Sequence, residues 1–371
     1  MAPFNVLHIV FIILSTLVFS LLLLFYSTLG YGIATLTYPR YFTPRHSNYS
    51  YPVPTYHDSL IDVRRFNYKG KCGDVFKYKP NNKKDLWLTA VGIRDVEYWD
   101  KIRDNTKFAF GLSNSSIPNA DRVVLYLDGL DIPEFFDIAE SYRVRVVRER
   151  VEKQSTKKGQ DVVRRFFAYF NFLSKNVGKY ERILISDQRD VFIFGDFFAT
   201  FSGDELVFLA ECDDGGINCV TFGVECVYNA MRDGFGTEEA DNYVKNGSIL
   251  MNAGTMFGGA EQIFLYVKKM VETLDVEKWE KWGYDQAVHN HLFYAFYNNS
   301  NVNNKNENNM SVDMCTQRAC FRERNTAVYS NYWKMLYTRG SGCSPVLRHK
   351  ILAEGFSIDH DRYYKKEEPI K

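Results

Sequence analysis

The stretch "ILISDQRDVFIF", residues 183–194, decides the expected fold and the expected position of the functional site. Two apolar, β-prone runs flank a polar interruption that holds Asp187, Arg189 and Asp190. A carboxylate buried without a partner is costly, so a core strand is seldom interrupted in this way without a purpose. The stretch therefore predicts a buried strand that ends in acidic side chains.

Strands and helices alternate on both sides of this stretch. The expected strands are at 86–92, 122–129, 142–149, 182–187 and 205–211, and the expected helices are at 95–105, 161–176 and 283–296. Residues 248–274 predict a strand, a glycine-rich turn and a helix from about Ala260. This alternation indicates an α/β fold with a mostly parallel sheet and helices on its faces. Ligands of such sheets bind beyond the carboxyl ends of strands, which is where Asp187 stands.

The N-terminal region differs in character from the rest. Residues 9–26 carry no charge and are long enough to cross a bilayer, which takes roughly 20 residues. The apolar part of a cleaved signal peptide is shorter, roughly 7–15 residues. We therefore expect an uncleaved anchor, and a secreted protein if the segment is cleaved. The expected organisation is a tail at 1–8, a transmembrane signal-anchor at 9–29, a stem at 30–84 and a folded domain at 85–371.

Two observations, the sequons and the cysteines, favour a lumenal domain over a cytosolic one. The arginines after the apolar span would place the domain in the cytosol if the positive-inside rule were read literally. Glycosylation sequons and cysteines favour the lumen of the Golgi or endoplasmic reticulum instead. The sequons are at Asn48, Asn114, Asn246, Asn298 and Asn309, and the seven cysteines are at 72, 212, 219, 226, 315, 320 and 343. If the cysteines pair, the odd one stays free or bridges chains. The alternative is seven ordinary buried thiols.

Composition excludes one class of partner. The 371 residues carry 46 Lys and Arg against 45 Asp and Glu, a net charge of +1. A polyanion binder needs a broad basic face, so no nucleic-acid partner is expected.

Asp187 and Asp190 are three residues apart, so a turn would bring both carboxylates onto one cation. Oxygen ligands with open positions suit Mg²⁺ or Mn²⁺, which commonly also bind substrate phosphates. Such an ion stabilises the charge that a nucleoside diphosphate gathers as it leaves a sugar. Arg189 would pair with either carboxylate or contact phosphate. The alternative is structural: one aspartate caps the turn and Arg189 neutralises it.

Four segments in order, across about 180 residues, resemble GT-A glycosyltransferases of the glycogenin- and galactinol-synthase-like group and its xylosyl- and galactosyltransferase relatives. "SDQRDVFIFGDFF" (186–198) is similar to the Asp-X-Asp segment, and "MNAGTMFGG" (251–259) to the Asn-Ala-Gly turn. "GYDQAVHNHLF" (283–293) is similar to the Asp-Gln helix, and "SIDHDRYY" (357–364) to the late histidine segment. The resemblance implies a GT-A, Rossmann-like catalytic domain.

The acidic motif departs from the family pattern because it reads D-x-x-D rather than D-x-D. Counted back from Asp196, Asp190 matches the second family aspartate and Gln188 the first. Asp187 is then either a displaced ligand or a neighbour.

The resemblance implies specific roles. Asp187, Asp190 and His360 would bind Mn²⁺ or Mg²⁺. Asn252, Ala253 and Gly254 would approach the donor sugar, while Thr89, Ala90 and Val91 would cradle the base. The remaining implied contacts are Arg189 and Arg362 to the diphosphate, and Asp285 and Gln286 to donor or acceptor hydroxyls. Asp285 would equally serve to stabilise a helix N-terminus.

The resulting expectation is a membrane-anchored, lumenal glycosyltransferase. It would transfer a sugar from a nucleoside diphosphate donor, with UDP favoured, to a glycan or glycoprotein hydroxyl. The family resemblance favours retention of anomeric configuration, although no nucleophile is evident. Two alternatives stay open: a non-catalytic glycan-binding protein that keeps the fold, and a metal-dependent phosphohydrolase or nucleotidyltransferase. Arg164 and Arg165 are expected on a solvated helix face, and 218–226 in a disulfide-tied loop.

Overall fold

The computed structural model consists of two units, Met1–Arg40 and Tyr41–Lys371. It describes residues 14–21, 48–127, 129–151, 160–213, 218–297, 309–321, 327–351 and 356. In the first unit, residues 14–21 are helical and exposed. Within the described ranges, no helix has both the length and the apolar character needed to cross a membrane. Most of the expected anchor at 9–29 lies outside these ranges and stays a prediction.

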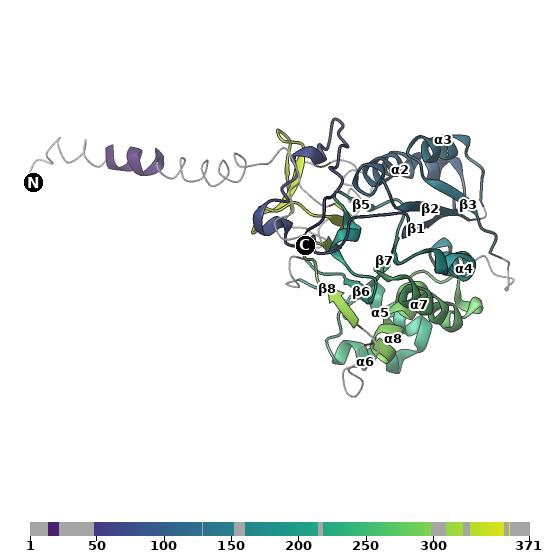
Figure 1. Cartoon of the computed structure of the whole chain (residues 1–371). Coiled ribbons are helices and arrows are strands. Elements are labelled where there is room, and N and C mark those ends of the chain that lie inside the picture. Colours follow the sequence, from purple (N-terminus) through teal and green to yellow (C-terminus); the bar gives the residue numbers. More distant parts are fainter. Residues whose placement is uncertain are drawn as a thin grey trace, which may run out of the picture. The chain divides into compact units, whose positions relative to one another are not determined.

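The second unit is built on a seven-stranded sheet with the order β3-β2-β1-β4-β7-β6-β8 (Figure 1). Its strands are β1 (Asp85–Val91), β2 (Asp121–Tyr126), β3 (Arg145–Arg148), β4 (Arg182–Ser186), β6 (Glu205–Ala210), β7 (Met251–Gly259) and β8 (Asn309–Asp313). Neighbouring strands are parallel except where β7 runs against β4 and β6. The expected α/β fold with a mostly parallel sheet is confirmed.

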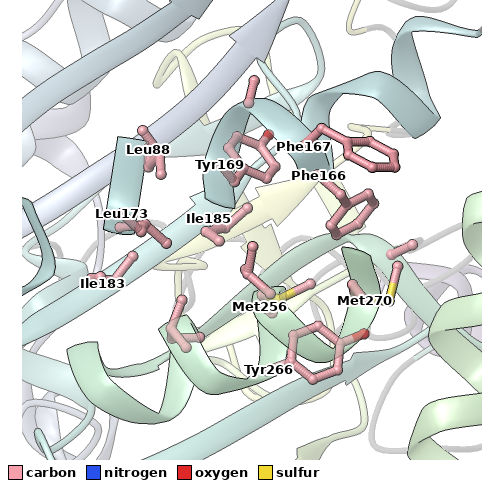
Figure 2. Packing of buried hydrophobic residues seen from close by; sticks show 14 of the residues in the cluster. Leu88, Phe166, Phe167, Tyr169, Leu173, Ile183, Ile185, Met256, Tyr266 and Met270 are labelled. Carbon is pink, nitrogen blue, oxygen red and sulfur yellow. The ribbon is translucent and has the colours of Figure 1, made fainter. Parts of the chain in front are cut away.

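One face of the sheet is covered by α4 (Asp161–Asn176), α7 (Ala260–Thr273) and α8 (Tyr284–Leu292). Figure 2 shows Phe166 and Leu173 of α4 beside Ile185 of β4 and Met256 of β7. Apolar residues at helical spacing on α4 fill this core, as the sequence predicts. The helix 161–176 is confirmed at both ends.

The other face is covered by α2 (Val96–Ser116) and α3 (Pro133–Ser141). Side chains alternate along a strand, so Trp87 of β1 points away from Leu86 and Leu88. Its ring packs on Phe110 of α2, with ring centroids 6.1 Å apart, and its indole N–H donates to Ser186 Oγ at 2.7 Å. The helix expected at 95–105 is thus confirmed but runs further, to Ser116.

Two helices, α5 (Glu225–Phe235) and α6 (Thr237–Lys245), form a smaller cluster beside α8. A second sheet has the order β5-β12-β9, and β10 pairs with β11 as a hairpin. These strands are β5 (Val191–Ile193), β9 (Ala319–Cys320), β10 (Ala327–Ser330), β11 (Met335–Thr338) and β12 (Leu347–His349). The short helical turns are 3-10 segments at Val63–Arg65, Gly70–Gly73, Val177–Lys179, Phe197–Thr200 and Val276–Lys278, and a π-turn at Phe293–Tyr297.

Residues 48–84 do not form the expected stem. Several of their side chains are buried: Tyr51, Ile61, Val63, Phe66, Tyr68, Cys72 and Phe76. Cys72 is bonded to Cys343 in a disulfide, and Asn81 donates through its backbone and side chain to Asp196. The expected domain boundary at Asp85 is therefore too late, because proline-rich sequence without periodicity can still pack on a core built by other segments.

The glycine-rich stretch 251–259 is not a turn. It is strand β7, and all nine of its residues are buried. Pairing with β4 on one side and β6 on the other overrides the local turn signal of Asn-Ala-Gly. The helix expected from Ala260 follows immediately.

All seven cysteines are accounted for in the described residues. Disulfides join Cys72 to Cys343, Cys212 to Cys219 and Cys315 to Cys320. Cys226 is free and exposed. The predicted odd thiol is confirmed. The expected disulfide-tied loop at 218–226 is confirmed through Cys219, which is bonded to Cys212, whereas Cys226 lies in α5 and stays free.

Candidate active site

The acidic pair lies in the link between strands of different sheets. Asp187 follows the last residue of β4, and Asp190 precedes the first residue of β5. In the antiparallel pairing of β5 with β12, Val191 lies opposite His349. The backbone N–H of Lys350 donates to the carbonyl oxygen of Asp190 at 2.7 Å. The second sheet thereby brings His349 to the acidic pair.

Asp187, Asp190 and His349 form a group with the spacing of metal ligands. His349 Nε2 is 3.5 Å from Asp187 Oδ2 and 3.5 Å from Asp190 Oδ1. One ligand atom from each residue lies within 4.8 Å of the other two. Mg²⁺ holds its oxygen ligands at roughly 2.0–2.1 Å, so adjacent ligands of one ion are about 3 Å apart. Asp190 Oδ1 is buried and has no hydrogen-bond partner in the described part of the chain. The spacing and this orphaned oxygen fit a divalent cation.

The ring of His349 is held from behind by β7. Its Nδ1 lies 2.9 Å from Thr255 Oγ1, while its Nε2 faces the carboxylates. A histidine that binds a metal usually donates its other N–H to an oxygen, which fixes the tautomer and the ring orientation. Thr255 is placed to accept that hydrogen bond.

Gly254 forms one wall of the triad. A Cβ at this position would lie 2.5 Å from Asp187 Oδ2 and 2.8 Å from His349 Cε1. Since side chains do not approach so closely, only glycine lets β7 pass behind the ligands. The close approach that Gly254 makes in the structure is to the triad, within a strand and not in a turn. Its expected approach to a donor sugar stays a prediction.

Arg165 connects the triad to α8. Its Nη1 forms an ion pair with Asp187, and its Nη2 donates to Asp285 Oδ2 at 3.0 Å and to the carbonyl oxygen of Ala253 at 3.3 Å. The residue is only 7% exposed. The expectation of a solvated face is therefore wrong for Arg165, because its guanidinium is held by Asp187, Asp285 and the carbonyl oxygen of Ala253.

Burial and neighbouring charges determine the ionisation of Asp190 and Asp285, the two buried aspartates of the site. Burial opposes ionisation of Asp190, but His349, Arg189 and Lys350 outweigh it and hold its pKa well below the usual range. Burial raises the pKa of Asp285 despite its ion pair. Of these two carboxylates, Asp190 is therefore the one better suited to hold a cation.

A cleft of about 380 Å³ opens from the triad. Its charged end contains the triad together with Arg165, Arg189 and Lys350. Asp285 and Gln286 of α8 also line this cleft. Their expected contact with donor or acceptor hydroxyls stays a prediction.

A smaller cavity of about 90 Å³ lies at the carboxyl end of β1. Ala90 and Val91 line it, and it shares Arg165, Asp187 and Arg189 with the larger cleft. Thr89 is fully buried and does not line the cavity. Two of the three expected base-binding residues therefore reach an opening beside the triad.

Asn252, Ala253 and Gln286 are engaged with the protein itself. Asn252 Nδ2 donates to Glu211 Oε1 at 2.9 Å, and its Oδ1 accepts from the N–H of Gly254 at 2.9 Å. Gln286 Oε1 accepts from the N–H of Ala253 at 2.9 Å, and its Nε2 donates to the carbonyl oxygen of Met251. These amides fix the start of β7 against α8, so their direct effect is to position the strand that carries Gly254 and Thr255.

The side chains of Asp187 and Gln188 point in different directions, which bears on which of them corresponds to the first aspartate of the D-x-D motif. Gln188 is buried, and its Nε2 donates to Thr106 Oγ1 of α2 at 2.9 Å. Asp187, the residue before it, points to the triad instead. Gln188, the formal match to the first family aspartate, is thus a packing residue.

His360 and Arg362 lie outside the described residues, so their expected roles remain predictions. Sequence reasoning did not find His349, Thr255 or Arg165. His349 is in the segment "VLRHK", whose strand β12 has only three residues and is too short to be recognised from sequence. Its position beside the aspartates depends on the pairing of β12 with β5. The only available signal was a histidine beside two basic residues.

A solved structure is similar to this chain at low level: a glycosyltransferase involved in the glycosylation of the major capsid of PBCV-1. The alignment covers 71% of this chain and 92% of that chain, with 10% identity and a TM-score of 0.32. At this level the similarity supports no statement about activity. No protein-family model and no curated protein matches the sequence.

Proposed function

We propose that the chain is a metal-dependent glycosyltransferase that transfers a sugar from a nucleoside diphosphate donor, with UDP favoured, to a hydroxyl of a glycan or glycoprotein. The observation that carries this proposal is the triad of Asp187, Asp190 and His349 at the carboxyl end of β4, with the orphaned Asp190 oxygen at the head of a cleft. Ligand sites of α/β sheets occur at this edge. The four sequence segments that resemble GT-A enzymes support the same assignment.

The three ligands would hold Mn²⁺ or Mg²⁺. When bound, such an ion offsets negative charge on the departing diphosphate. Arg189 and Lys350 line the same end of the cleft and add positive charge there. Thr255 and Gly254 orient the ligands and leave room for them.

The small cavity and the larger cleft would bind different parts of the donor. The base would enter the small cavity beside Ala90 and Val91, and the sugar would lie toward Asp285. Arg165, paired with both Asp187 and Asp285, keeps these carboxylates at a fixed separation. The Asp285 carboxylate is then placed to accept a hydrogen bond from a sugar hydroxyl.

In the proposed reaction, an acceptor hydroxyl oxygen bonds to the anomeric carbon while the bond from that carbon to the diphosphate oxygen breaks. The nucleoside diphosphate leaves, and the hydroxyl proton passes to it or to solvent. Retention of configuration is proposed on the family resemblance.

The test is donor turnover by the purified domain with and without Mn²⁺, using UDP-glucose, UDP-galactose and UDP-xylose. Asp190→Asn should reduce metal-dependent turnover by about 100- to 1,000-fold, because stabilisation of leaving-group charge by a metal is worth several kcal/mol. Asp196→Asn is the matched control, because Asp196 is equally buried in the same segment but does not line the cleft.

Different results separate the alternatives. Free inorganic phosphate as the main product would indicate a phosphohydrolase. Glycan binding without Mn²⁺ or UDP binding by calorimetry would indicate a non-catalytic protein. Full activity in Asp190→Asn would overturn the metal assignment.

We also propose that the domain lies on the lumenal side of a Golgi or endoplasmic reticulum membrane, anchored by residues 9–29. Three disulfides support an oxidising compartment. The sequons at Asn48 and Asn246 are exposed, whereas Asn114 is half-buried and accepts from Arg122 at 2.9 Å. Glycosidase-sensitive gel shifts that disappear in Asn48→Gln and Asn246→Gln would support this topology, and unmodified protein from cells would contradict it.

A further inference from the structure

The cleft has two chemically different halves. Its charged half surrounds the triad. The other half is lined mainly by apolar side chains from the segment before α5, from α5 itself, from the residue before β7 and from the turn before α8: Val220, Phe222, Val224, Val227, Leu250 and Trp282. Its one charged side chain among the described residues is Glu211, whose carboxylate accepts from Asn252 Nδ2. Binding clefts commonly combine apolar walls with a few polar groups that fix orientation. The donor accounts for the charged half, so the apolar half is left for the second substrate.

Trp282 stands out among the tryptophans. It is 72% exposed, whereas Trp87, Trp99 and Trp279 are at most 2% exposed. Val224, also on the cleft wall, is 44% exposed. An exposed indole and an exposed valine that line one cleft are typical of a binding surface.

The indole is exposed on a fixed piece of backbone. Gly283 follows it with φ +75°, in the left-handed region, and a Cβ at Gly283 would lie 3.0 Å from the Cβ of Ala230 on α5. Lys278 Nζ donates to the carbonyl oxygen of Gly234 at 2.8 Å and ties the same turn to the end of α5. Trp282 is therefore presented by a packed turn, three residues before Asp285.

We propose that Trp282, with Val224 and Val227, forms the acceptor subsite and stacks on the apolar face of a pyranose ring. This proposal rests on the proposed function and narrows it: the acceptor is a saccharide, and the enzyme extends an existing glycan. A pyranose presents C–H groups on one face and hydroxyls around its edge. That combination matches a cleft wall that carries an exposed indole together with the polar side chains of Asp285 and Asn252.

The acceptor hydroxyl reacts as described above, so the stacked ring supplies the oxygen that bonds to the anomeric carbon. Since Trp282 contacts the acceptor and not the donor, its loss should weaken acceptor binding alone. Donor hydrolysis, in which water replaces the acceptor, should be unchanged.

The kinetic test uses Trp282→Ala, Trp282→Phe and the control Tyr332→Ala. Tyr332 is 78% exposed and does not line the cleft. For methyl pyranosides of glucose, galactose, mannose, xylose and N-acetylglucosamine, the best acceptor should show a KM about 10-fold higher in Trp282→Ala, as for the loss of one aromatic stacking contact. Trp282→Phe should restore most of the affinity, and Mn²⁺-dependent donor hydrolysis should remain equal in all variants.

A second measurement does not depend on activity. Cys226 is the free thiol, is exposed and lines the same wall. In the wild type, the best pyranoside should slow alkylation of Cys226 by iodoacetamide, and UDP with Mn²⁺ should slow it less. In Trp282→Ala this protection by the pyranoside should disappear.

The outcomes distinguish this proposal from the proposed function. Protection of Cys226 without any donor turnover would keep the saccharide site and reject the transferase. Turnover with an unchanged acceptor KM in Trp282→Ala would reject the subsite and keep the transferase. Absence of protection by every pyranoside would reject the subsite, as would an acceptor preference that follows the length of an alkyl aglycone rather than the sugar ring.

Discussion

Strand β4 begins at one group of buried charges and ends at another, and the two groups are bonded differently. At its start, Arg182 donates to both oxygens of Asp85, at 2.8 Å and 2.7 Å. It also donates to the carbonyl oxygen of Lys79 at 3.0 Å. At its end, Arg165 Nε and Asp190 Oδ1 are buried without hydrogen-bond partners in the described part of the chain.

The difference separates structure from function. A buried ion pair is tolerated when further hydrogen bonds satisfy the remaining donors and acceptors. The pair at the start of β4 meets that condition and does not line the cleft. The group at the end does not meet it, and it faces a cleft. At the start of β4, Asp196 Oδ1 is also buried without a hydrogen-bond partner in the described residues, but Asp196 does not line the cleft. The end that combines an unsatisfied carboxylate oxygen with a cleft is therefore the one placed to bind a ligand.

The largest expected effect comes from breaking the closed end. Arg182→Met should lower the free energy of unfolding by about 3–5 kcal/mol, because Asp85 would remain as an uncompensated buried charge. Urea denaturation measures this. The double variant Asp85→Leu with Arg182→Met should lose less than Arg182→Met alone. Turnover per folded molecule should stay constant, and a selective loss of turnover would mean that the two ends are coupled.

The second prediction concerns pH at the closed end. Asp196 accepts from Asn81 close to Arg182, and burial raises its pKa to about 6. Between pH 4 and 6 the native state keeps a proton that the unfolded state has lost. This carboxyl therefore makes stability fall as pH rises through that window, by about 3 kcal/mol in total.

Asp196→Asn removes this titration. The unfolding free energy of the variant minus that of the wild type should increase from pH 4 to pH 6.5, measured by denaturation at each pH. A constant difference would show that Asp196 has an ordinary pKa and that the closed end tolerates its charge.

The smallest expected effect is at the open end. Thr255→Val removes the oxygen beside His349 Nδ1, and loss of such a partner typically weakens metal affinity 10- to 100-fold. Calorimetric titration with Mn²⁺ measures it. Thr200→Val is the control, since this buried threonine donates to the carbonyl oxygen of Phe197 near the closed end. Equal Mn²⁺ affinity in both variants would count against His349 as a ligand.

Much of the fold could be predicted because its signals are local. The helical spacing of apolar residues at 161–176 and the apolar runs of β1, β2 and β4 can be recognised without knowing any tertiary contact. These elements were found where expected. Residues 48–84 and 251–259 were misjudged because their local composition indicates loops. Long-range pairing, through Cys72–Cys343 and through the neighbours of β7, decides their structure.

The site was predictable only in part for the same reason. Asp187 and Asp190 can be recognised in the sequence because they interrupt an apolar run. Arg165 is one of two consecutive arginines in the first turns of α4. The direction of its side chain depends on how α4 packs on the sheet. His349 depends on a three-residue pairing between β12 and β5. Neither residue has a local signal that distinguishes it from ordinary surface charge.

The late position of His349 has a consequence for biosynthesis. A nascent chain that has reached Asp313 already contains every strand of the seven-stranded sheet, and chains begin to fold while the ribosome is still elongating them. Such a chain has both aspartates but not the histidine. The triad is complete only after β12 has been translated, so prematurely terminated chains should fold their large sheet yet lack the third ligand of the proposed metal site.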